Sequence, residues 1–88
     1  MSTAEKLDLD ARVRDVVCDR ERLHVHLDDG RQISVPLRWY PRLDRATPEQ
    51  RSRWEPAGAG FGIHWPEIDE DLSVDGLLAG RAAPGVTK

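Results

Sequence analysis

The stretch RLHVHLDDGRQISVPL, residues 22–37, decides the fold. Apolar residues alternate with polar ones from Arg22 to Asp28, which predicts a strand with one buried face and one wet face. Asp28-Asp29-Gly30 follows, and an Asp-Gly pair between two alternating runs favours a hairpin, because type I′ turns need positive φ at both central residues. The alternation resumes over residues 31–36 and predicts the returning strand.

The segments on either side extend this hairpin into an α+β fold. Valine-rich residues 12–18 predict a preceding strand, so the first half is expected to be a three-stranded antiparallel β-meander. The prolines at 36 and 41 end the sheet, because proline cannot donate to a ladder. Residues 62–65 predict a short fourth strand, which Pro66 stops.

Two short helices are predicted after the meander. Thr47-Pro48-Glu49-Gln50 combines an N-cap, a proline at the first helical position and a capping box, which predicts a helix near residues 48–54. Ser73 is the expected N-cap of a second helix, near residues 74–79, that ends at Gly80. We therefore expect one α+β domain over residues 11–80, with a flexible lead-in (1–10) and a flexible tail (81–88).

Composition restricts the class of protein. The chain has 88 residues, a net charge of −3 and a single cysteine, Cys18, so an intrachain disulfide is impossible and a reducing, cytoplasmic compartment is expected. No apolar run approaches the ~20 residues of a membrane-spanning helix. Charge is uneven: Arg38–Arg53 holds five arginines, whereas Glu67–Asp75 holds five acidic residues and no base.

In combination and order, several blocks resemble the small bacterial proteins classed as domain of unknown function 2442. These blocks are the hairpin with its Asp-Asp-Gly turn, VPLRWYPRL at 35–43, Arg-x-x-Trp at 51–54 and GFGIHWPEIDEDLS at 60–73. The resemblance covers roughly residues 11–80 and implies an α+β fold with helices after a meander. It implies no catalytic residues. It does imply small neighbouring proteins as partners, in arrangements similar to toxin–antitoxin pairs.

Two kinds of catalytic or metal chemistry compete with simpler interpretations. His24 and His26 share one strand face, and with His64 or an acid from 69–71 they could bind zinc or nickel; the alternative is that they only face solvent. The acids at 67–71 could include a general acid–base pair, but so short a chain has little depth for a cleft. We expect instead that these acids favour the positive end of the helix after Ser73, and that residues 62–73 close the fold. No enzyme activity, metal or cofactor is predicted.

The expected function is a non-enzymatic interaction module that binds a partner protein or associates with itself. Aromatic residues beside arginines are typical of interface hot spots, although they could equally pack internally. The alternative is an antitoxin-like or DNA-associated regulator acting with a neighbouring small protein; direct nucleic-acid binding is not expected from an acidic chain. The candidate interaction surface comprises Arg38, Trp39, Tyr40, Arg42, Asp69, Glu70 and Asp71.

Overall fold

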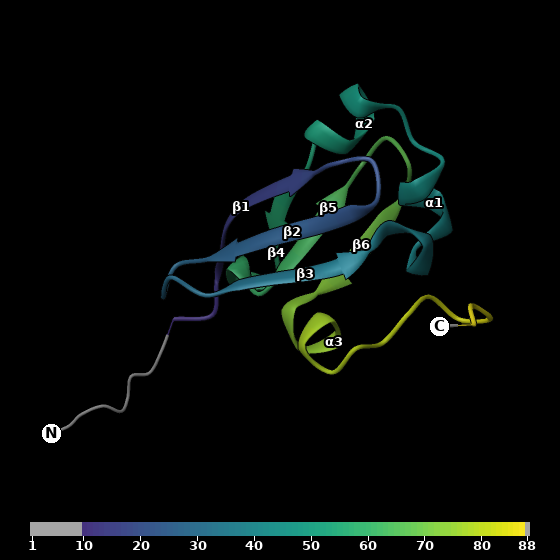
Figure 1. Cartoon of the computed structure of the whole chain (residues 1–88). Helices are drawn as coiled ribbons and strands as arrows, with labels where there is room; N and C mark the ends of the chain where they lie inside the picture. The colour runs from purple at the N-terminus through teal and green to yellow at the C-terminus, as the bar shows by residue number, and fades with distance from the viewer. Residues whose placement is uncertain (1–9, 88) are drawn as a thin grey trace, which may run out of the picture.

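A computed structural model describes residues 10–87 and shows two three-stranded antiparallel sheets facing each other (Figure 1). The first sheet contains β1 (Val13–Cys18), β2 (Arg22–Leu27) and β3 (Gln32–Pro36), and the second contains β4 (Glu55–Ala57), β5 (Gly62–Trp65) and β6 (Glu70–Ser73). Their order in space follows the chain. The predicted lead-in lies almost wholly outside the described residues.

Short helices join and flank the sheets. The 3-10 turn η2 (Leu37–Trp39) and helix α1 (Pro41–Asp44) follow the first sheet, and α2 (Pro48–Ser52) leads to the second. A further 3-10 turn, η3 (Gly58–Gly60), joins β4 to β5, and α3 (Val74–Leu78) follows β6 and contacts β3.

The core lies between the two sheets. Leu23, Val25 and Leu27 of β2 are fully buried, as are Ile63 and Trp65 of β5, and all five belong to one apolar cluster. Each central strand therefore turns its apolar face inward, which is the arrangement that the alternating sequence of β2 predicts. The α+β class and the meander are confirmed.

The hairpin is confirmed, but its turn differs from the expected type. Gly30 has a φ of +93°, whereas neither aspartate before it has positive φ, so this is not a type I′ turn. The Gly30 amide donates to the Leu27 carbonyl, and the Leu27 amide donates to the Arg31 carbonyl. These two bonds close a three-residue loop in which only the glycine adopts the left-handed conformation.

Both helix-start predictions are confirmed, although the first helix is shorter than expected. The Thr47 side chain accepts a hydrogen bond from the Gln50 amide, and the Gln50 side chain accepts one from the Thr47 amide. The Ser73 hydroxyl accepts a hydrogen bond from the Gly76 amide. Helix α2 ends at Ser52, because residues from Glu55 onward leave it to form β4.

The structure has a second three-stranded sheet where the sequence predicts only one short fourth strand. β5 is the centre of a sheet whose edge strands are β4 and β6. The acids expected to charge the start of the last helix lie instead in the turn 66–69 and on β6, because residues 70–73 pair with β5. Within the first turn of α3 the acidic residue is Asp75. The prediction that residues 62–65 bury Ile63 and Trp65 is confirmed.

Candidate functional site

The structure brings the basic and the acidic segments of the candidate surface together. The Arg42 guanidinium, on α1, donates a hydrogen bond of 2.5 Å to the backbone carbonyl of Asp69. A second link joins the Arg53 guanidinium to the Glu67 carboxylate at 2.7 Å, and this pairing raises the pKa of Arg53. Part of the charge asymmetry in the sequence is thus neutralised within the molecule.

The turn between β5 and β6 positions Asp69 for this contact. Asp69 has a φ of +54°, a left-handed conformation that aspartate tolerates better than most residues. The turn places its carbonyl toward α1. On the other side, the Arg51 side chain donates to the carbonyls of Leu43 and Asp44, and so satisfies carbonyls at the end of α1.

Tyr40 belongs to the core and forms only the floor of the candidate surface. Its side chain is 2% exposed, and its hydroxyl donates a hydrogen bond of 2.8 Å to the Arg81 carbonyl. Burial raises the pKa of this phenol, and the nearby Glu70 carboxylate raises it further. Trp39 is half-buried against the core, and its carbonyl accepts a hydrogen bond from the Ala83 amide. The segment 81–83 is therefore docked onto the domain; the predicted flexibility of the tail as a whole stays a prediction.

Glu70 connects two adjoining hollows above this floor. One, of about 240 Å³, lies among β6, α3 and the C-terminal segment, and the other, of about 470 Å³, lies beside α1. Both hollows are lined by Glu70, Ala83 and Pro84. We use the name Arg42–Glu70 surface for the lining of the hollow beside α1 together with Tyr40 beneath it, that is, Tyr40, Pro41, Arg42, Arg45, Glu70, Ala83 and Pro84.

The remaining predicted residues lie around this surface. Arg38 is exposed, and neither it nor Arg45 has an ionic or hydrogen-bonding partner for its side chain among residues 10–87. Asp71 lies on the outer face of β6, where its carboxylate is 2.8 Å from the His64 Nδ1. Sequence reasoning missed Ala83 and Pro84, since nothing in their local pattern predicts that the chain end returns to α1.

The histidines do not converge on one metal site. His24 and His26 alternate with buried residues of β2 and face outward from the first sheet, whereas His64 faces outward from the second. Both nitrogens of His24 already have partners: Nδ1 is 2.7 Å from the Ser34 hydroxyl, and Nε2 is 2.9 Å from the Asp19 carboxylate. Within the described part of the chain no three His, Cys, Asp or Glu side chains are grouped to hold a metal ion.

The chain belongs to the family described as "Protein of unknown function (DUF2442)", whose model matches residues 13–83, which confirms the resemblance. No curated protein matches it. Among the helices described, none is long and apolar enough to cross a membrane.

Two solved structures are similar. A protein of unknown function from Rhodospirillum rubrum is 34% identical with a TM-score of 0.72, over 84% of this chain and 92% of that one. An uncharacterised protein from Chromobacterium violaceum is 26% identical with a TM-score of 0.71, over 84% of this chain and 70% of that one.

Proposed function

We propose that this protein is a non-enzymatic interaction module of the bacterial cytoplasm, which binds a partner protein through the Arg42–Glu70 surface. The observation that carries the proposal is the pair of adjoining hollows between α1, β6 and the C-terminal segment. The cytoplasmic address rests on Cys18, which is a free thiol.

The composition of this surface supports binding to a protein. Pro41, Ala83 and Pro84 provide apolar walls, while Arg45 and Glu70 provide opposite charges at the hollow beside α1. An apolar centre with a polar rim is the usual organisation of a protein–protein interface. Exposed arginine is also enriched at such sites.

The scaffold beneath the surface is well suited to hold it in place. Tyr40 and the Arg81 carbonyl tie the chain end to the floor, and Arg42 ties α1 to the turn at Asp69. A surface that is already ordered costs less conformational entropy when a partner binds.

A second candidate function is the antitoxin-like, DNA-associated regulator. The observation that favours it is the pair of exposed arginines, Arg38 and Arg45, whose side chains have no partner among the described residues. Arginine side chains of this kind contact phosphate, and the resulting affinity falls steeply with salt.

The test of the first candidate is affinity capture from the native host with a matched set of variants. The wild-type chain should retain a specific protein that Arg38→Glu combined with Arg45→Glu loses. Light scattering of the purified chain distinguishes a partner from self-association. A bare monomer with no protein retained reproducibly would refute the interaction module.

A further inference from the structure

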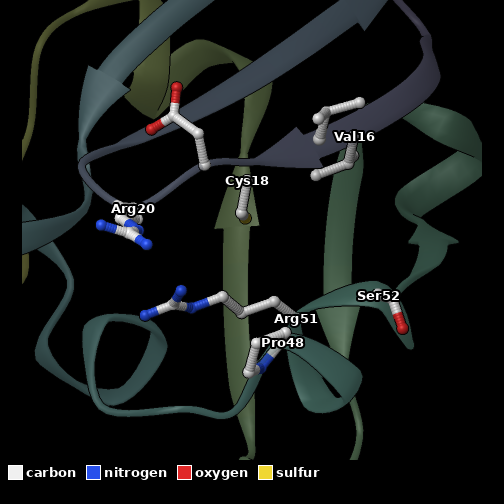
Figure 2. A pocket seen from close by; sticks show the side chains of 8 residues that line it. Val16, Cys18, Arg20, Pro48, Arg51 and Ser52 are labelled. Atoms are coloured by element: carbon white, nitrogen blue, oxygen red, sulfur yellow. The ribbon is translucent and has the colours of Figure 1, made fainter.

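A third hollow lies between β1 and α2, apart from the two that adjoin the Arg42–Glu70 surface. It has a volume of about 380 Å³, within the range of ~300–1,000 Å³ typical of ligand sites. Its walls are the consecutive residues 16–20 on one side and Pro48, Arg51 and Ser52 on the other. Figure 2 shows the Cys18 side chain directed from the strand toward Arg51.

β1 is an edge strand, and its pairing with β2 fixes which backbone groups point outward. The Asp19 amide donates to the Arg22 carbonyl, and Val17 is paired with His24 in the same register. Because hydrogen-bonded pairs alternate in an antiparallel ladder, Val17 and Asp19 turn their amides and carbonyls toward β2. Those of Val16 and Cys18 point away from the sheet.

One of these outward groups is capped and the others are open to a new strand. The Val16 amide donates a hydrogen bond of 2.8 Å to the Asp15 carboxylate, and the register shift between Val13 and Asp15 disrupts the strand before it. Both features protect an edge against pairing. The Val16 carbonyl and the amide and carbonyl of Cys18 have no backbone partner among residues 10–87.

A second copy of this chain fits the edge poorly. In an antiparallel pairing that sets Val16 opposite Cys18 of another copy, Arg14 falls opposite Arg20 and Asp15 opposite Asp19. Setting Cys18 opposite itself places Arg14 opposite Arg22 and Asp15 opposite Glu21. Like charges directly across a ladder are destabilising, so the sequence of β1 disfavours self-pairing.

The charge at one end of the hollow indicates the chemistry of a different occupant. Arg20 and Arg51 both line it, and in Figure 2 their guanidinium groups lie at the same end. Arg51 uses Nε and Nη2 on the carbonyls of Leu43 and Asp44, which leaves its Nη1 for a ligand. The Asp19 carboxylate, the acidic group among the lining residues, is engaged by His24 and by the amides of Glu21 and Arg22. The apolar side chains of Val16 and Pro48 line the rest.

We propose that this groove binds an extended segment of another protein, which adds a strand to β1 and places a carboxylate at Arg20 and Arg51. Backbone pairing with Val16 and Cys18 provides the affinity, and the apolar wall and the two arginines provide the selectivity. This surface is separate from the Arg42–Glu70 surface, so either can fail without the other.

The test uses the full chain labelled with ¹⁵N and the acetylated, amidated peptide Glu-Val-Thr-Val-Thr-Val-Glu. This probe offers a carboxylate at either end, so it serves both strand directions. We expect saturable shifts of the Cys18 and Arg20 amides and of residues on α2. A peptide with lysine at both ends should bind about 3–5-fold more weakly, the effect of one exposed charge pair.

Two controls separate strand addition from simple charge attraction. The same peptide with every internal amide N-methylated should lose binding, and Arg20→Glu should remove the preference between the two charged peptides, because its carboxylate offsets the remaining charge of Arg51. Arg20 is exposed and has no described partner, so this variant should fold normally. Absence of saturable shifts, shifts confined to other surfaces, or equal binding of the N-methylated peptide would overturn the proposal.

Discussion

Replacing Trp65 by alanine should destabilise the domain by about 3–5 kcal/mol, the usual cost of deleting a buried aromatic side chain. Trp65 is the largest of the fully buried side chains, at 0% exposure, and its indole Nε1 donates a hydrogen bond of 3.1 Å to the Arg51 carbonyl. It therefore joins β5 to the end of α2 as well as filling the space between the sheets.

The magnitude is large relative to the whole stability of the domain. At roughly 0.05–0.15 kcal/mol per residue, a chain of this length has about 4–13 kcal/mol in total. With a urea dependence of about 1–1.5 kcal/mol/M, the loss corresponds to a fall of about 2–5 M in the denaturation midpoint. Trp65→Phe, which keeps most of the ring but loses the Nε1 donor, should lose about 1–2 kcal/mol.

The assay is urea denaturation followed by far-UV circular dichroism, since Trp39 and Trp54 complicate fluorescence. Leu78→Ala is the matched control, because Leu78 is 52% exposed and its truncation removes apolar volume without opening a cavity. Its free energy of unfolding should stay within about 0.5 kcal/mol of the wild-type value. A midpoint for Trp65→Ala equal to that of the control would refute the packing of the two sheets.

Two further predictions follow from the outer surfaces. Hydrogen bonds from His24 and neighbouring amides hold the pKa of Asp19 at about 2, below its ordinary value of 3.8. The stabilisation is therefore complete above about pH 4 and is lost as the pH falls toward 2. Asp19→Asn should lower the melting temperature by a constant amount near neutrality and by nothing near pH 2. A lower melting temperature that persists at pH 2 would contradict this origin. The isolated protein should not bind its own promoter DNA at micromolar concentration in mobility-shift titrations at two salt concentrations. Salt-sensitive binding that Arg38→Ala with Arg45→Ala abolishes would favour the regulator instead.

The sequence predicts best those elements whose signals are local. The first sheet follows from the alternation around the Asp-Asp-Gly loop, and the starts of α2 and α3 follow from Thr47 and Ser73, because caps are formed within a few residues. Even in the hairpin, the sequence does not predict the type of turn, because that depends on how the two strands pair. Only the structure shows that Gly30 alone needs the left-handed conformation.

The sequence predicts only part of the second sheet, because its edge strands have weak strand patterns. β4 contains Pro56, which usually argues against a strand, and β6 has one apolar residue, Leu72, among polar ones. Leu72 is opposite Ile63 and packs against the core, so its burial depends on pairing with β5 and not on its own pattern. Edge strands of this kind are specified by tertiary context.

The sequence predicts the candidate surface as two separate segments, and it does not predict that these segments meet. Arg42 and Asp69 are 27 residues apart and meet only because the β5–β6 turn reaches α1. Likewise, the sequence does not decide whether Tyr40 belongs to the core or to an interface, because its hydroxyl bonds to the Arg81 carbonyl, 41 residues away.

The most direct test of the proposed function is partner binding measured with three forms of the chain. Affinity capture from the native host, with quantitative mass spectrometry, should compare the wild type, the Arg38→Glu and Arg45→Glu double variant, and a His26→Ala control on the outer face of the first sheet. We predict one protein retained equally by the wild type and the control and reduced at least about ten-fold by the double variant, because reversing two arginine charges at the interface opposes a partner that complements them. Equal retention by all three forms would contradict the assignment of the Arg42–Glu70 surface.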